Sequence, residues 1–348
     1  MNTKLEVEKV SVIVLAFNRK HLLCGCLESL FVQCDSGGEF EIIVVDDGSM
    51  DGTGDMLKNM MLKHMNLRYI YQPHQGIPTA RNKGILHATG QIIAFVADDY
   101  LLEFDYVKTI IEFFKKHQNA VAVRFKVNGA DRSFVSRINH FYFDASVKKR
   151  LRLVPGNREE ITMNHDLDAS GGAAFKKMVF EEVGLFDESL QRAEDTDMAI
   201  RMRGRGLNIY YNPYHVIRHR YNPSLLDTIR KSFLTGIYRY DYYLKYSGKY
   251  FSWNGLVRSG SVSKMDALLH AYWSAKETDS LGVFVVSIPF LFVFEFVNKI
   301  GFFLSMCYQI LVMISGCRLL KKKIVGGADP SCVQSKAKST EEDGTINT

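Results

Sequence analysis

Short apolar runs alternate with amphipathic stretches from residue 10 to about residue 125. The apolar runs are rich in β-branched residues, which is typical of buried strands. Because continuous apolar strands alternate with helices, the pattern predicts an α/β fold with a mostly parallel sheet covered on both faces. We expect strands at Ser11–Phe17, Glu41–Val45, Leu67–Tyr71, Gln91–Ala97 and Ala120–Lys126, and helices at His21–Val32, Gly54–His64, Pro78–His87 and Phe104–His117.

Two of these strands run directly into a pair of aspartates. Asp46 and Asp47 end the second strand, and Asp98 and Asp99 end the fourth. Ligands of open α/β sheets bind beyond the carboxyl ends of the strands, and adjacent carboxylates repel each other unless a cation lies beside them. The pairs therefore favour a divalent cation and, with it, a phosphate ligand. The alternative is a surface turn that caps the next helix.

From residue 130 onward, the chain no longer shows the regular alternation of strands and helices. Residues 130–165 predict irregular, basic loops over the site or a flap that faces an acceptor. Ile209–Pro213 and Val216–Tyr221 predict two further short strands. Ahead of these two strands, an acidic run from Glu194 to Asp197 leads into a predicted helix. The basic residues of the loop region are Arg132, Arg137, Lys148, Lys149, Arg150 and Arg152.

Composition narrows the function classes. The chain has 348 residues, enough for one large domain or two ordinary ones, and its net charge of +6 does not suggest a nucleic-acid partner. Its six cysteines show neither CxxC nor zinc-ligand spacing, which indicates reduced thiols in a cytosolic setting. The first nine residues are too polar for a signal peptide.

The C-terminal third changes character. Residues 223–280 are basic and aromatic, as expected of a helical segment beside a membrane. Residues 281–317 hold two apolar blocks that we expect to form a membrane-associated helical pair. A hairpin would return the basic start of the tail at 318–348 to the cytoplasmic face, in line with the positive-inside tendency. The alternative is a pair of buried helices at an oligomer interface.

Five segments resemble, in order, the motifs of glycosyltransferase family 2. The matches extend over roughly residues 10–220. The resemblance implies a GT-A fold in a catalytic domain of residues 1–222, and inverting transfer of a sugar from a nucleotide donor. The segments are Ser11–Arg19, Val44–Thr53, Gly76–Gly84, Ala97-Asp98-Asp99 and Glu194–Arg201.

The resemblance assigns roles on the donor side. It implies that Asp47 reads the nucleotide base, that Asp98 contacts the ribose, and that Asp99 holds a Mn²⁺ or Mg²⁺ ion bridging the phosphates. Phe17 is a candidate to cover the base, although a first-strand aromatic is as often part of the core. The family's metal motif begins with an aspartate, and Ala97 stands there instead.

Two further donor-side residues have competing interpretations. Arg81 is a candidate phosphate ligand, and a surface arginine on the same helix is the alternative. His219 resembles the third metal ligand found in some family members. His215 is the competing candidate, and a core or exposed histidine is the remaining alternative for either.

On the acceptor side, Asp195 is the candidate general base, which takes the proton from an attacking hydroxyl. The alternative is that Glu194 and Asp195 only favour a helix N-terminus. Gly171 and Gly172 resemble the acceptor-side region, with a tight turn as the alternative.

Together these features predict a transferase with a nucleotide-sugar donor, for which the uracil-reading role of Asp47 favours UDP. The apolar C-terminal region suggests a lipid-linked or surface-glycan acceptor. Transfer to a polyprenyl phosphate is an alternative, although an ionised acceptor needs no base. A catalytically inert nucleotide- or glycan-binding scaffold is the second alternative.

Overall fold

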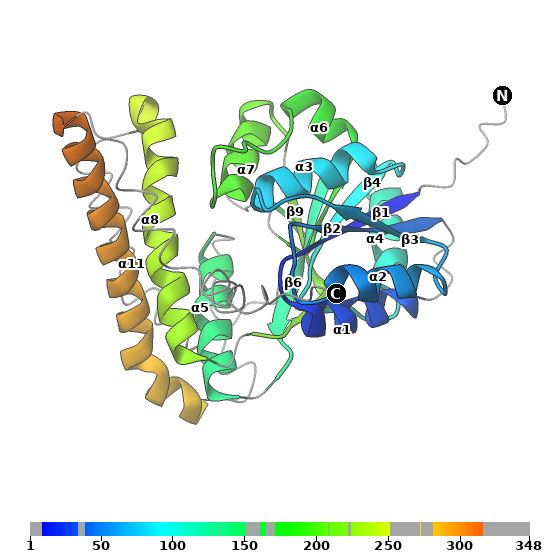
Figure 1. Cartoon of the computed structure of the whole chain (residues 1–348), viewed down its shortest axis with the longest axis horizontal. Coiled ribbons are helices and arrows are strands. Elements are labelled where there is room, and N and C mark those ends of the chain that lie inside the picture. Colours follow the sequence, from blue (N-terminus) through cyan, green and yellow to red (C-terminus); the bar gives the residue numbers. More distant parts are fainter. Residues whose placement is uncertain are drawn as a thin grey trace, which may run out of the picture.

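The computed structural model describes residues 9–33, 39–131, 133–150, 161–164, 171–207, 209–221, 224–250, 272 and 281–315. A nine-stranded sheet in the order β3-β2-β1-β4-β8-β6-β9-β5, with β7 paired to β9, lies between helices (Figure 1). The strands are β1 Val10–Ala16, β2 Phe40–Asp46, β3 Leu67–Tyr71, β4 Ile92–Ala97, β5 Tyr100–Leu101, β6 Ala122–Gly129, β7 Thr162–Asn164, β8 Ala173–Lys176 and β9 Ile209–His219. The helices are α1 Lys20–Phe31, α2 Thr53–Met61, α3 Ile77–His87, α4 Tyr106–Lys116, α5 Phe134–Arg150, α6 Met178–Val183, α7 Glu194–Gly204, α8 Leu225–Tyr250 and α11 Leu281–Ser315.

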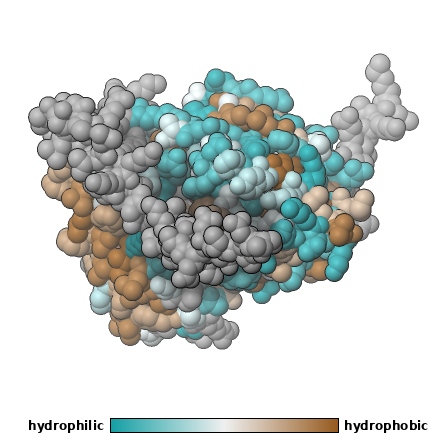
Figure 2. Space-filling model, in the orientation of Figure 1, coloured by the Kyte–Doolittle hydropathy of each residue, from teal (hydrophilic) through white to brown (hydrophobic). Residues whose placement is uncertain are grey.

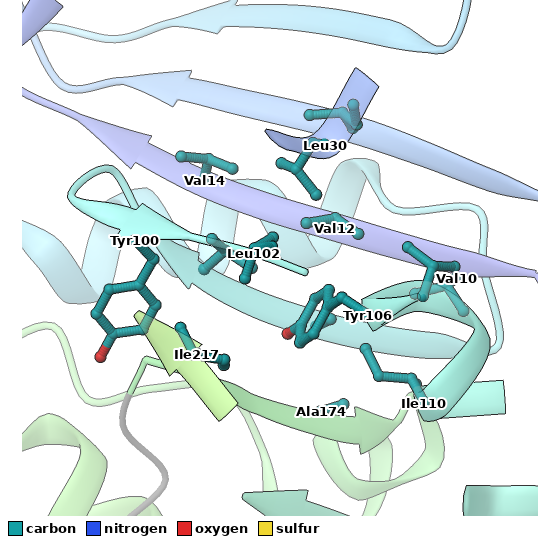
Figure 3. Packing of buried hydrophobic residues seen from close by; sticks show 14 of the residues in the cluster. Val10, Val12, Val14, Leu30, Tyr100, Leu102, Tyr106, Ile110, Ala174 and Ile217 are labelled. Atoms are coloured by element: carbon teal, nitrogen blue, oxygen red, sulfur yellow. The ribbon is translucent and has the colours of Figure 1, made fainter. Parts of the chain in front are cut away.

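The first half of the sheet is parallel, as the alternating pattern predicts. Strands β3, β2, β1 and β4 pair in parallel, and β1 lies in the middle with both faces covered. Helices α1, α2 and α4 cover one face, and α3, α6 and α7 cover the other (Figure 1). Figure 3 shows the packing on the first face, where Val12 and Val14 of β1 lie near Leu30 of α1.

The second half is mixed. Strand β8 is antiparallel to both β4 and β6, and β9 runs parallel to β6. The expectation of two short strands at residues 209–221 is wrong, because β9 is one strand with a bulge opposite Phe125 and Lys126. The bulge includes Pro213, whose missing N–H would otherwise break the ladder.

The expectation of irregular loops across residues 130–165 is wrong for α5. Ile138, Phe141 and Ala145 recur at helical spacing and are buried. The basic residue Lys148 is also buried, because it pairs with Asp144 one turn earlier at 2.9 Å. Residues 132, 151–160 and 165 lie outside the described residues, so the flap interpretation of that part stays a prediction.

The expected helical pair at residues 281–317 is wrong for the described part. Leu281–Ser315 is one helix that continues through both apolar blocks and includes Pro289. Polar residues between the blocks do not end it, because Asn298 is buried and donates to the Ser232 carbonyl of α8 at 3.0 Å. Helices α8 and α11 lie side by side, and Gly236 and Gly301 allow the close approach of their backbones (Figure 1).

Candidate functional site

The register of the parallel strands brings the sequence-predicted donor residues to one edge of the sheet. Ala16 of β1 is opposite Asp46 of β2, and Leu15 is opposite Ala97 of β4. The three strands therefore end at the same level. Phe17, Asp47 and Asp98, the residues that directly follow these strands, lie next to one another beyond the carboxyl edge.

Asp47 is buried within a network of protein donors. Its Oδ1 accepts from the Gln72 side chain at 2.7 Å and from the Gln75 backbone N–H at 2.9 Å, and its Oδ2 accepts from the Gly76 N–H at 2.9 Å. The His74 ring lies 2.8 Å from the same Oδ2 and stacks on Phe17, with ring centroids 4.1 Å apart. Phe17 therefore lies at the site rather than in the core.

The Asp98–Asp99 pair is bridged by one guanidinium. Arg19, three residues after the end of β1, contacts Asp98 Oδ1 through Nη1 at 2.7 Å and Asp99 Oδ2 through Nη2 at 2.6 Å. Burial and the negative charge of Asp99 raise the pKa of Asp98 to about 7, against the opposing effect of Arg19. Burial also acts to raise the pKa of Asp99, but His219 and Arg19 bring it well below its usual range. The two carboxyls titrate as a pair, and Asp99 loses its proton first.

The short strand β5 decides between the two candidate histidines. Tyr100, directly after Asp99, pairs with His219 across the β5–β9 ladder. This pairing places His219 Nε2 3.2 Å from Asp99 Oδ2. His215 lies against Asp105 and Thr109 of the α4 region instead. Of the two, His219 is therefore the histidine at the aspartate pair.

The beginning of α7 forms the other side of the site. Glu194 is buried, and its Oε1 lies 2.9 Å from Nη1 of Arg81. The interpretation of Arg81 as a surface residue is wrong, because it is 9% exposed and lies over the rings of Phe95 and Phe186. Burial raises the pKa of Glu194, with Arg81 opposing the shift and Asp195 adding to it.

The neighbouring Asp195 is only partly buried. Its Oδ1 accepts from the Thr196 backbone N–H at 2.7 Å. Ala193, which precedes this acidic pair, has φ of 64°, an uncommon conformation for a residue with a Cβ. The local backbone conformation thus places two adjacent carboxyl groups in different environments.

A third carboxylate of this helix, Asp197, has a different setting. It is fully buried and accepts from Arg201 on its own helix, and from Lys245 and Tyr246 on α8. These contacts fix α8 against α7.

Gly171 and Gly172 lie beside Tyr100, the residue that follows the aspartate pair. They form a turn before β8, where Gly171 accepts from the Tyr100 hydroxyl at 3.4 Å, and Gly172 has φ of 82°. The tight-turn interpretation therefore describes their backbone, and the acceptor role stays a prediction.

The donor set for a metal is small. In the described parts of the chain, no group of three or more His, Cys, Asp or Glu side chains could hold an ion alone. Asp99 and His219 together offer one carboxylate oxygen and one imidazole nitrogen, which both Mn²⁺ and Mg²⁺ accept when other oxygens complete their shell. The pair fits an ion that takes its remaining ligands from a diphosphate and water.

Three residues that shape the site have no role predicted from the sequence: Arg19, Gln72 and His74. Arg19 and its place after β1, two residues beyond Phe17, were visible in the chain. Its contact with the aspartates depends on the order β1-β4 in the sheet, which one sequence does not display.

Comparisons with known proteins agree with this geometry. A family model described as "Glycosyl transferase family 2" matches residues 11–184. The chain is 34% identical over 136 residues to glycosyltransferase GlyA of Streptococcus pneumoniae serotype 4, which covers 39% of the chain and 18% of that protein. It is 27% identical over 250 residues to the uncharacterized glycosyltransferase EpsJ of Bacillus subtilis, covering 67% and 70%.

Among solved structures, the fold is similar to that of the mannosyltransferase PcManGT from Pyrobaculum calidifontis in complex with GDP-Man and Mn²⁺. The TM-score is 0.51 at 18% identity, over 92% of the chain and 79% of that structure. At this identity the likeness establishes the fold.

Proposed function

Because the chain belongs to glycosyl transferase family 2 and has the GT-A fold, we propose that it transfers a sugar from a UDP-sugar to a hydroxyl group, with inversion of the anomeric carbon. The acceptor is a lipid-linked or surface glycan. The observation that carries the proposal is the gathering of Asp47, Asp98 and Asp99 beyond one sheet edge, together with Asp195 in the first turn of α7.

On the donor side, Asp47 is the base reader. Its carboxylate is held in place by Gln72 and two backbone N–H groups, so its orientation is set before the nucleotide arrives. The half-exposed His74 is the partner that a base N–H replaces, because it occupies the Oδ2 side. Phe17 then stacks on the base in place of the His74 ring.

Asp99 and His219 hold a Mn²⁺ or Mg²⁺ ion in this proposal, and the structural relative with bound Mn²⁺ supports the choice of metal. When bound, the ion neutralises charge on the nucleoside diphosphate leaving group. Asp98 orients the ribose from the neighbouring position.

On the acceptor side, Asp195 takes the proton of the attacking hydroxyl. Thr196 fixes the orientation of the Asp195 carboxylate through Oδ1. Glu194 lies between Asp195 and Arg81 and positions the start of α7 against β4. General-base catalysis at such a group typically contributes about 10²–10⁴-fold in rate.

We also place the enzyme on the cytoplasmic face of a membrane, held through α11. Val285–Ser305 is long and apolar enough to cross a bilayer, by length and composition. However, α8 lies along α11 and is fixed to α7 through Lys245, so a bilayer that enclosed α11 would also enclose this charged helix. Helix α11 therefore lies in the plane of the interface, with its outer face in one leaflet.

The outer face of α11 supports this orientation. Apolar side chains gather on the α11 edge of the molecule (Figure 2). Basic residues follow the helix in the sequence, where they can contact anionic lipid. The exposed apolar residues of this face are Val285, Val286, Phe292, Val293, Phe296, Ile300, Phe303 and Leu304.

Vesicle flotation tests the membrane assignment. The full chain should float with vesicles of phosphatidylcholine and phosphatidylglycerol, and replacing Phe292, Phe296 and Phe303 together with serine should abolish flotation. The matched control replaces Leu62 and Met65, which are exposed apolar residues of the catalytic domain, with serine. Tags at both chain ends that are digested from the same side of sealed vesicles support the in-plane orientation; protection of one tag contradicts it.

The activity test uses the full chain in membranes with Mn²⁺ and a panel of UDP-, GDP- and dTDP-sugars. Nucleotide release that depends on a glycan acceptor is expected with a UDP-sugar, and Asp99→Ala should remove its dependence on the metal. Release with no sugar nucleotide of the panel contradicts the proposed transfer.

A polyprenyl phosphate is the second candidate acceptor, and one observation favours it. Arg192 lies close enough to Glu194 and Asp195 for their charges to affect its pKa, which burial lowers overall. A cation beside the base position can bind a phosphate-bearing acceptor. Asp195→Asn distinguishes the candidates, because transfer to an ionised phosphate should survive the substitution.

A further inference from the structure

One cation at the site has no role in the transfer described above. Arg19 bridges Asp98 and Asp99, yet its side chain is 35% exposed, against 7% and 10% for the two carboxylates. The carboxylates are thus fixed in the protein, whereas the guanidinium lies at the solvent side of the contact.

The backbone beneath Arg19 is also fixed. Asn18 has φ of 51°, its N–H donates to Ser49, and its side chain accepts from the Met50 N–H. Arg19 itself occupies the N-cap position of the 12-residue helix α1. Only the long side chain can move, and it does so from a point directly beside the donor edge of the sheet.

Arg19 and a divalent ion need the same atom. Asp99 Oδ2 lies 2.6 Å from Arg19 Nη2 and 3.2 Å from His219 Nε2. An ion held by Asp99 and His219 therefore takes the oxygen that the guanidinium contacts, and the two positive charges repel each other. While Arg19 occupies the aspartate pair, the ion binds only weakly without a nucleotide.

A nucleoside diphosphate changes this balance. The planar guanidinium fork fits phosphate oxygens as well as it fits carboxylates, and the N-terminus of α1 adds to the attraction for an anion. A second cation, Lys231 of α8, lies close enough for Arg19 and Asp99 to affect its pKa, which burial and Arg19 lower. An arriving anion relieves the repulsion between these two cations.

We propose that Arg19 is an internal counter-ion: it occupies the aspartate pair in the free enzyme and turns to the donor diphosphate when a divalent ion takes Asp99. This inference rests on the proposed function, because it needs a metal-dependent nucleotide donor. Its consequence is positive coupling, in which nucleotide strengthens metal binding and metal strengthens nucleotide binding by the same factor. We expect a factor of about 10 or more, within the usual range for coupled sites.

Mn²⁺ binding to the full chain, followed by electron paramagnetic resonance with and without UDP, tests the proposal without relying on turnover. Wild type should bind Mn²⁺ weakly alone and about 10-fold more tightly with UDP. Arg19→Gln should bind Mn²⁺ alone several-fold more tightly than wild type and gain several-fold less from UDP, the remaining gain being the direct ligation of the ion by the diphosphate. Arg19→Lys should fall between them, because an ammonium cannot bridge two carboxylates as a fork.

Arg68→Gln is the matched control, since Arg68 is 41% exposed and pairs with the buried Glu41 at 2.8 Å, away from the aspartate pair. Its Mn²⁺ affinity and coupling should equal those of wild type, and thermal unfolding confirms that each variant is folded. Unchanged Mn²⁺ affinity and coupling in folded Arg19→Gln overturn the role of Arg19 alone. If wild type binds no Mn²⁺ with UDP, GDP or dTDP, the metal-dependent donor site is wrong and this inference falls with it.

Discussion

Two buried aspartates on opposite sides of the site both lie beside cationic side chains, but the partners are of different kinds. Asp99, on the donor side, contacts Arg19 and His219, and Asp197, on the acceptor side, contacts Arg201 and Lys245. Both are carboxylates beside cations. Each lies in an acidic motif that is adjacent to a predicted strand or helix. Their side chains differ in exposure, 10% for Asp99 and 0% for Asp197.

The nature of the partners separates the two. Asp197 has an arginine on its own helix, a lysine and a tyrosine from α8, and it connects two helices of the fold. The partners of Asp99 are groups that an incoming ion can replace or share. Both kinds of carboxylate therefore come from acidic motifs in the sequence. Only the identity of the partners distinguishes a binding site from a structural anchor.

The largest effect on the transfer rate should come from Asp195, which lies on the acceptor side and neither connects helices of the fold nor binds the donor. Asp195→Asn should lower the rate of transfer to a hydroxyl acceptor about 1,000-fold, because the amide cannot take the acceptor proton. UDP and Mn²⁺ affinities should be unchanged, which binding measurements check. Asp55→Asn, an exposed acid in the first turn of α2, is the control and should keep full activity. Wild-type rates in Asp195→Asn would contradict the base assignment.

Replacing Asp197, the structural anchor between α7 and α8, should mainly lower the stability of the fold. Asp197→Asn should lower the free energy of unfolding by about 3–5 kcal/mol, the usual cost of leaving buried charges without their partner. Urea denaturation measures the loss. Lys245→Met removes a partner that is 32% exposed, so it should cost less than removing Asp197 itself. A loss of activity without loss of stability in Asp197→Asn would mean that Asp197 belongs to the catalytic machinery and is not a structural anchor.

The elements of the parallel half were predictable because their signals are local. Strands β1, β2 and β4 are continuous apolar runs, and the aspartates at the ends of β2 and β4 are adjacent to them in the chain. The helix α5 was missed because its basic residues suggested a solvated loop, although Lys148 is neutralised by Asp144 inside the fold. The single strand β9 was missed because Pro213 looked like an end rather than a bulge.

The partners of the site residues were less predictable than the residues themselves. Asp99 and Asp195 were predicted as site residues from their motifs and His219 from its position, but the contact of Asp99 with His219 requires the β5–β9 pairing. Lys245 reaches Asp197 only because the fold brings the side chains of α8 to the start of α7, which no spacing in the sequence encodes. Long-range pairing, and not local propensity, determines which charges meet.

Glu41 extends the comparison to a buried carboxylate far from both sides of the site. Burial acts to raise its pKa, but hydrogen bonds from Ser11, Arg68 and Thr89 lower it from 4.5 to about 2. Such a shift corresponds to about 3 kcal/mol of stability. Because the folded pKa is depressed, this contribution is complete above pH 4.5 and is lost as the pH falls through 2.

Glu41→Gln should therefore be about 3 kcal/mol less stable than wild type at pH 7, with the difference shrinking as the pH falls below 4.5. Urea denaturation across that range measures it. A difference that stays constant with pH would mean that shape, and not charge, is what Glu41 contributes. Transfer activity at pH 7 should remain, which separates this anchor from the donor-side acids.

The smallest expected effect is on Mn²⁺ affinity, measured in variants of the two histidines of β9. His219 lies 3.2 Å from Asp99, so His219→Ala should weaken Mn²⁺ binding measured with UDP by about 10-fold. His215 lies against Asp105 and Thr109, so His215→Ala should leave that affinity unchanged while lowering stability through the cavity it opens. Equal Mn²⁺ affinities in the two variants would remove His219 from the metal site. The ion would then depend on Asp99 and the diphosphate, and the replaceable partner on the donor side would be Arg19 alone.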